Sequence, residues 1–147
     1  MSELCQLEAA GASDVGRIRE HNEDTFLIRQ DLGLYLVADG AGGHNAGEVA
    51  SALAARSLSN YFGSTVRETH DKPEFDHFGL SNGARRMSRG IKKANQDIVA
   101  ISKGSTEHRG MGTTVVAAGY SARSGLLHIG HMGTAAATGS AAGTSSF

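Results

Sequence analysis

The chain has 147 residues, which is long enough for one domain with a hydrophobic core and argues against two domains. Its 14 basic and 15 acidic side chains give a net charge of −1, which argues against a nucleic-acid or membrane surface as partner. Because no apolar run approaches the roughly 20 residues of a membrane span and residues 1–3 lack the pattern of an export signal, we expect a cytoplasmic protein.

Acidic residues gather at one end of a predicted hairpin. Residues 4–12 alternate weakly and predict a first strand, and residues 13–24 have the composition of a loop. The apolar runs 25–29 and 34–38 then predict two strands joined by a tight turn at 31–33. In the simple register Asp39 lies opposite the start of the first arm, so hairpin closure brings it to Glu23 and Asp24.

Converging carboxylates repel one another unless a cation lies between them. The residues concerned are Glu23, Asp24 and Asp39, and the glycines after Asp39 leave backbone carbonyls accessible. Hard oxygen donors of this kind suit Mg²⁺ or Mn²⁺ better than Zn²⁺. The sequence therefore predicts a divalent-cation site at this end of the hairpin.

Two helices are predicted from apolar residues spaced by three and four positions. The first covers residues 45–62, with Asn45 able to cap its start and Gly63 ending it. The second covers residues 81–102 and carries a narrow apolar stripe, with five basic residues elsewhere around it that we expect to form a solvated face.

A polar loop and a second hairpin complete the predicted elements. Residues 64–79 are polar and contain the single proline, so they read as a loop. Residues 113–120 and 126–129 are rich in apolar and β-branched side chains and predict the two arms of a hairpin.

Four segments resemble a known family in both their residues and their spacing along the chain. They are SDVGRIREHNED at 13–24, LVADGAGGH at 36–44, GEVAS at 47–51 and GMGTTV at 110–115. Together they resemble the bacterial branch of the PPM-type (type 2C), metal-dependent Ser/Thr protein phosphatases. The resemblance implies an α+β fold, a β-sandwich flanked by helices (αββα), here incomplete at the C-terminus. It also implies two Mn²⁺ or Mg²⁺ ions, phosphorylated Ser/Thr proteins as substrates and a Ser/Thr kinase as a further partner.

The resemblance also assigns roles to metal ligands. By motif, Asp39 would bridge both metal ions, Gly40 would offer its backbone carbonyl, and Glu23 would hold the second ion directly or through water. Asp24 is a weaker candidate for the metal shell. In the family two ions activate a water that attacks phosphorus.

Arg19 is the residue at the family's phosphate-binding position. A guanidinium suits this role because its planar fork donates two parallel hydrogen bonds to phosphate oxygens and stays charged. The alternative is an ion pair of Arg19 with Glu20 or Glu23.

The chain departs from the family after Ile129. The family pattern continues with Gly-Asp-Ser-Arg and two later aspartates, whereas residues 133–147 contain only Ala, Gly, Thr, Ser and one Phe. We therefore divide the chain into residues 1–132, the N-terminal portion of the phosphatase domain, and a low-complexity tail that we expect to be frameshifted or disordered. One inserted guanine in a back-translation of the tail restores Met-Gly-Asp-Ser-Arg, so we hypothesise a single-base deletion.

The missing aspartates lead us to expect a weak or inactive enzyme. Magnesium that keeps most of its waters is poorly positioned, and a displacement of about 1 Å can cost 10²-fold in rate. An exposed apolar sheet face would also favour aggregation and marginal folding. Two alternatives remain: a non-catalytic remnant that binds a phosphoprotein or kinase, and a nucleotide-binding loop at 39–43, which lacks the Lys-Ser/Thr ending of a P-loop.

Overall fold

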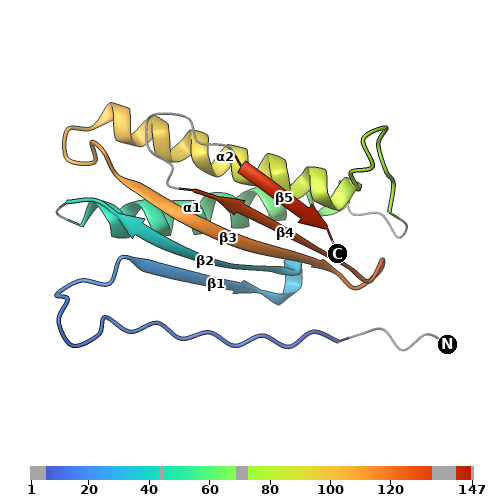
Figure 1. Ribbon diagram of the computed structural model, residues 1–147, viewed down its shortest axis with the longest axis horizontal. Coiled ribbons are helices and arrows are strands. Elements are labelled where there is room, and N and C mark those ends of the chain that lie inside the picture. Colours follow the sequence, from blue (N-terminus) through green and yellow to red (C-terminus); the bar gives the residue numbers. More distant parts are fainter. Residues whose placement is uncertain (1–5, 44, 69–72, 134–141, 147) are drawn as a thin grey trace.

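A computed structural model describes residues 6–43, 45–68, 73–133 and 142–146. Its elements are β1 (Asp24–Arg29), η1 (Gln30–Leu32), β2 (Leu34–Ala41), α1 (Ala46–Ser64), η2 (Val66–Glu68), α2 (Asn82–Gly104), β3 (Gly112–Ser121), β4 (Leu126–Met132) and β5 (Ala142–Ser146). The strands form one sheet in the order β1-β2-β3-β4-β5, antiparallel throughout, and both helices lie on one of its faces (Figure 1). This is the predicted α+β class. Of the four layers of an αββα sandwich, the described residues form two, one of helices and one of strands.

The two predicted hairpins are present. β1 pairs with β2 so that Asp24 faces Asp39, which confirms the register expected from the sequence. The turn between them requires glycine: Gly33 has φ of +60°, and a Cβ there would lie 2.0 Å from the carbonyl oxygen of Tyr120. In the second hairpin β3 is one residue longer at each end than predicted, and β4 starts at the predicted residue but continues to Met132.

Both predicted helices are also present, but their ends differ from the prediction. Asn45 occupies the N-cap position of α1 with a left-handed φ of 64°, and its side chain makes no capping hydrogen bond. The helix then continues through Gly63, so the predicted capping by Asn45 and the end at Gly63 are wrong. At α2, Ser81 caps the start, because its Oγ accepts a hydrogen bond from the N–H of Ala84 at 3.1 Å.

The core lies between the helices and the facing side of the sheet. Its largest fully buried apolar side chains come from both layers: Leu34, Leu58, Met87, Ile91, Ile98, Met111 and Val115. α2 approaches β4 so closely that a Cβ at Gly130 would lie 2.4 Å from Cδ1 of Ile91. The helices are joined by the Ser57 hydroxyl, which donates to the carboxylate of Asp97.

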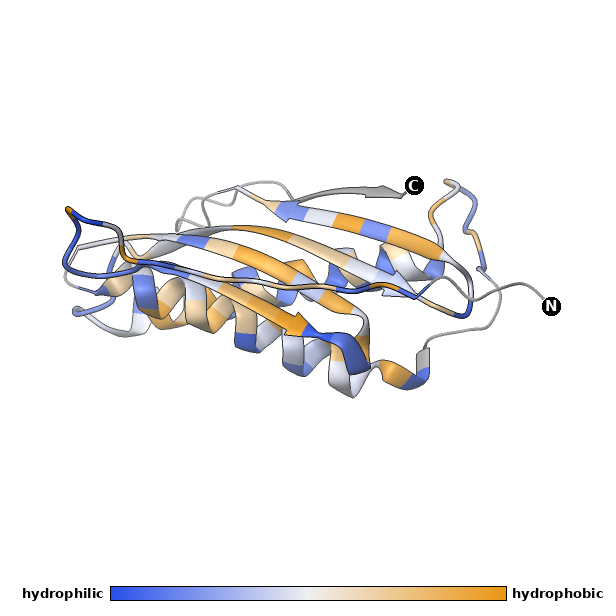
Figure 2. Cartoon of the chain, turned by 90° about the horizontal axis from the view of Figure 1, so that it is seen from below, coloured by the Kyte–Doolittle hydropathy of each residue, from blue (hydrophilic) through white to orange (hydrophobic). Residues whose placement is uncertain are grey.

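The other face of the sheet is apolar and open. Along β1, β2 and β3 the side chains that point away from the helices include Phe26, Val37 and Val116, which are 37%, 59% and 50% exposed. Figure 2 shows the helices gathered on one side of the sheet and hydrophobic residues along the strands. This matches the apolar face expected for one sheet of a sandwich.

The N-terminal segment runs beside β1 without joining the sheet (Figure 1). Within the described part, residues 6–12 belong to no strand, so the strand predicted over 4–12 is wrong there. The segment instead packs by contact, since a Cβ at Gly11 would lie 2.6 Å from the ring of Phe26. The weak alternation of side chains in residues 6–12 therefore accompanies packing beside β1, not hydrogen-bonded pairing with it.

The tail contributes one strand. The composition of residues 133–147 predicts no regular element, yet β5 pairs antiparallel with β4, Ala142 facing Met132. Backbone hydrogen bonding needs no particular side chain, so composition does not signal it. Residues 134–141 and 147 lie outside the described residues, and the frameshift stays a hypothesis. In the described part of the chain, no helix combines the length and apolarity needed to cross a membrane.

Candidate functional site

Two carboxylates share the open face at the end of the sheet. Asp24 at the start of β1 and Asp39 near the end of β2 are register partners, and both are exposed. Thr114 of β3 is the next residue in the same row. Directly opposite residues of antiparallel strands project from the same face, so the carboxylates stand side by side. Like charges in this position repel each other and create a place for a cation.

Glu23 continues the pairing by one residue but turns its side chain the other way. Its carbonyl oxygen accepts a hydrogen bond from the N–H of Gly40 at 3.1 Å. Its carboxylate lies against Gly47 in the first turn of α1, where a Cβ would be 2.5 Å from Oε1. Successive residues of an extended chain face opposite sides. Glu23 and Asp39 are therefore neighbours in backbone, as predicted, but their side chains leave from opposite faces.

Arg19 lies beside Glu23. It is exposed, and it lines a hollow of about 620 Å³ together with Glu20, His21, Glu23 and Asn45. Within the described chain Arg19 forms no ion pair with Glu20 or Glu23, the alternative that the sequence left open. Arg19 and Glu23 thus line one hollow.

Four of the five predicted site residues line two neighbouring hollows, whereas Gly40 is buried in β2 and lines neither of them. Asp24 and Asp39 line a second one, of about 280 Å³, with Phe26, Val37 and Thr114 on the open face of the sheet. The backbone between the hollows is fixed from β3, because the hydroxyl of Thr113 donates to the carbonyl oxygen of Asp39 at 2.9 Å. The sheet end thus separates an Arg–Glu hollow from an Asp–Asp hollow.

The donor set fits a divalent ion that keeps much of its water. Carboxylate and carbonyl oxygens are the donors that Mg²⁺ and Mn²⁺ take, and Mg²⁺ is commonly held by one or two carboxylates with several waters. Within residues 6–43, 45–68, 73–133 and 142–146, no three His, Cys, Asp or Glu side chains are placed to hold one metal. The chain therefore offers the right chemistry for such an ion but not a protein cage around it.

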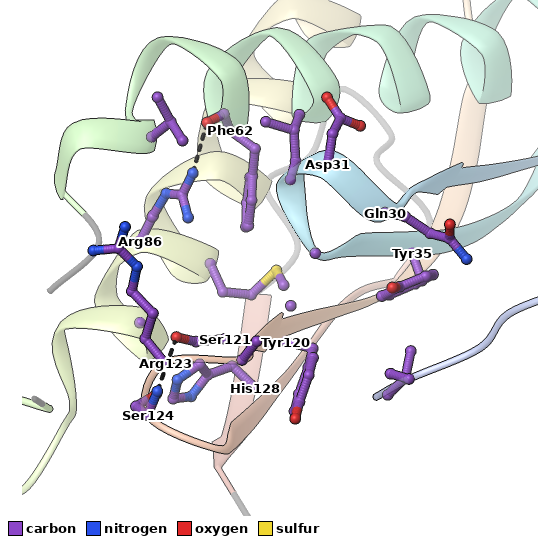
Figure 3. Close-up of a pocket in the computed structure, with 18 of the residues that line it drawn as sticks. Gln30, Asp31, Tyr35, Phe62, Arg86, Tyr120, Ser121, Arg123, Ser124 and His128 are labelled. Atoms are coloured by element: carbon purple, nitrogen blue, oxygen red, sulfur yellow. Dashed lines mark hydrogen bonds between the residues drawn. The ribbon is translucent and has the colours of Figure 1, made fainter. Parts of the chain in front are cut away.

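Another cavity lies at the opposite end of the strands. It measures about 830 Å³, and none of the predicted site residues lines it. Figure 3 shows Arg86, Arg123 and His128 along one wall, with Gln30 and Asp31 across from them. Burial lowers the pKa of His128.

Arg86 in this wall is structural. Its guanidinium donates to the carbonyl of Phe62 at 2.6 Å and to Oγ1 of Thr65 at 2.8 Å, and it lies 4.3 Å from the centre of the Phe62 ring. The expected solvated face is thus wrong for Arg86, which is buried. Its position between the two helices is set by packing, which helix periodicity alone does not show.

Comparison with known proteins places this fold and its acidic strand ends in a family. Residues 16–145 match the family model described as protein phosphatase 2C. This match spans most of the chain, and the chain belongs to the protein phosphatase 2C family.

Its relatives are bacterial Ser/Thr phosphatases. The serine/threonine phosphatase stp of Listeria monocytogenes is 36% identical over 115 residues, which cover 76% of this chain and 42% of the relative. The serine/threonine protein phosphatase PstP of Mycobacterium tuberculosis is 34% identical over 125 residues, 84% of this chain and 21% of that protein. The chain thus spans less than half the length of these relatives.

Solved structures agree with the sequence comparisons. The crystal structure of M. tuberculosis PstP superposes with a TM-score of 0.62 at 30% identity, covering 83% of this chain and 45% of that one. The PstP catalytic domain in complex with two manganese ions gives a TM-score of 0.62 at 31% identity, with coverage of 83% and 46%. The fold is therefore that of part of a PP2C-type domain.

Proposed function

We propose that this chain forms part of a metal-dependent phosphatase that hydrolyses phosphoserine and phosphothreonine in proteins, and that it is weak or inactive by itself. The observation that carries the proposal is the register pair Asp24–Asp39 at the strand ends, beside the hollow that holds Arg19 and Glu23. The names of the relatives support the substrate class, because they are Ser/Thr phosphatases. The two manganese ions of the PstP complex support Mn²⁺ as a cofactor, with Mg²⁺ an equivalent hard ion.

The residues of the chain have separate tasks in this proposal. Asp39 and Glu23 would hold divalent ions from either side of the sheet end, aided by the carbonyl of Gly40 and, more weakly, by Asp24. Such ions, when bound, supply activation of water and neutralisation of charge on phosphate. Arg19 would bind the phosphate through two parallel hydrogen bonds and keep phosphorus near the carboxylates. A phosphoprotein substrate, a Ser/Thr kinase partner and a cytoplasmic location belong to the same proposal.

The expected weakness follows from the number of donors. With at most two or three carboxylates, an ion keeps most of its waters and its position is loosely fixed. A misplacement of about 1 Å can lower a rate by 10². Substrate binding through Arg19 does not compensate, because uniform binding of substrate and transition state leaves the chemical step unchanged.

The test is hydrolysis of p-nitrophenyl phosphate and of a phosphothreonine peptide by the purified chain with Mn²⁺. We expect turnover near the blank, with any residual Mn²⁺-dependent rate lost in Asp39→Ala. Asp31→Ala is the matched control, an aspartate in η1, between β1 and β2, that pairs with Arg29. Robust turnover that needs Asp39 would contradict the weak activity. A residual rate that Asp39→Ala leaves intact would contradict the role of Asp39.

A further inference from the structure

We infer that Gly47 is a positioning residue for the carboxylate of Glu23. This inference rests on the proposed function, in which Glu23 is a metal ligand. It goes beyond that function by naming the residue that determines the position of the Glu23 side chain. Gly47 belongs to the GEVAS segment at 47–51, to which no chemistry is otherwise assigned.

Three backbone segments meet at this point without room for side chains. A Cβ at Gly40 would lie 2.1 Å from the carbonyl oxygen of Gly47 and 2.7 Å from that of Glu23. A Cβ at Gly47 would lie 2.5 Å from Oε1 and 2.7 Å from Cδ of Glu23. The end of β2, the residue before β1 and the first turn of α1 are thus in backbone contact, and two glycines permit it.

A second contact holds α1 against β1. The hydroxyls of Thr25 and Ser51 lie 2.9 Å apart and share a hydrogen bond, and Ser51 is fully buried. Ser51 lies one helical turn after Gly47, so α1 cannot tilt away from β1 without breaking this bond. The helix start therefore forms a fixed wall against which the carboxylate of Glu23 rests.

The two neighbours of a methyl group at position 47 would respond differently. The carboxylate of Glu23 ends a flexible side chain and can swing away at little cost. The backbone nitrogen of Ala41, 2.9 Å from a Cβ at position 47, would also have to shift, and this costs stability because strand backbone moves less readily than the end of a side chain. Gly47→Ala should therefore displace the carboxylate of Glu23 and also cost some stability at Ala41, and its effect on a ligand of Glu23 should come through the displaced carboxylate.

A metal-free experiment tests the position itself. The ¹³C resonance of the Glu23 carboxyl carbon should move in Gly47→Ala. It should stay in place in Gly63→Ala, a substitution in the same helix where a Cβ meets nothing within 4 Å. An unchanged Glu23 resonance in Gly47→Ala would overturn the inference whether or not the chain binds metal.

A titration with Mn²⁺ tests the consequence through paramagnetic broadening of amide signals near residues 23 and 39–40. Gly47→Ala should raise the half-broadening concentration by roughly tenfold, the usual cost of losing a residue that orients a ligand, and Gly63→Ala should leave it unchanged. In the Glu23→Ala background, Gly47→Ala should add no further loss. An equal loss in that background would show that position 47 acts through Ala41 and overturn the inference. No broadening in the wild-type chain would count against the proposed metal site instead.

A shorter side chain at position 23 gives a second test that can be used if Gly47→Ala alone does not fold. Glu23→Asp withdraws the carboxylate by one methylene, so Gly47→Ala should lower the melting temperature less in this background than in the wild type, the remaining loss coming from the contact with Ala41. A melting temperature that falls as far as in the wild-type background would overturn the inference, because the conflict would then lie with the backbone.

Discussion

Asp24 and Asp39 face each other across β1 and β2, two carboxylates in one register pair on the open face of the sheet. Strand pairing holds their Cβ atoms about 5 Å apart, so the two carboxylates stay close to each other. Such a pair costs stability when no cation is present and becomes a binding site when one is. This relationship underlies both the proposed function and the first prediction.

In metal-free buffer, Asp39→Asn should stabilise the fold by about 0.5 kcal/mol, because like charges directly opposite in a sheet are destabilising. Added Mn²⁺ should stabilise the wild type and leave Asp39→Asn unchanged. Urea unfolding with chelator and with Mn²⁺ measures both effects. A loss of stability in Asp39→Asn without metal would show that the two carboxylates do not repel.

Gly130→Ala should destabilise the fold by about 1–3 kcal/mol, the usual cost of overpacking a core. The added methyl would meet Cδ1 of Ile91 at 2.4 Å and Cγ of Met87 at 2.6 Å. Gly104→Ala, where a Cβ meets nothing within 4 Å, is the control and should not destabilise. Equal midpoints of urea unfolding for the two variants would mean that α2 does not press on β4.

The buried imidazole of His128 should make the fold sensitive to mild acid. Burial lowers the pKa of His128 from 6.5, so the unfolded chain binds the proton more readily. Its contribution to stability is complete above pH 6.5 and is lost as the pH falls through the folded-state pKa. His128→Gln should reduce the fall in melting temperature between about pH 7 and pH 5, and an equal fall in the variant would contradict this role of His128.

The open sheet face should govern self-association. Val37 and Val116 are register partners and both exposed, so replacing both with threonine should reduce aggregation at little cost in stability. Val115→Thr is the matched control: it places a hydroxyl at a buried position one residue away and should destabilise by about 1–3 kcal/mol. Light scattering and thermal unfolding separate the two outcomes. Unchanged aggregation of the double variant would show that the chain does not self-associate through this face of the sheet.

The parts of the fold that the sequence predicts are those with a strong local signal. Two apolar runs on either side of the turn at 31–33 predict the first hairpin with its register, and an apolar stripe after Ser81 predicts α2. The burial of Arg86 was not predicted, because it depends on a contact with Phe62 of another helix.

The sequence names the candidate site residues, but it does not predict the face of the sheet toward which the Glu23 side chain points. The signal was present, because consecutive residues of an extended chain face opposite sides, so Glu23 and Asp24 cannot both face Asp39. The contact of Glu23 with Gly47 depends on the path of α1, which no local pattern fixes. The roles of Arg19, Glu23, Asp24, Asp39 and Gly40 stay predictions.

The most direct test of a partial metal site is the uptake of Mn²⁺ by the purified chain, followed by electron paramagnetic resonance of the free ion. We expect weak uptake that Asp39→Asn abolishes and Asp31→Asn leaves unchanged. Tight, stoichiometric uptake, or uptake indifferent to Asp39→Asn, would contradict the account.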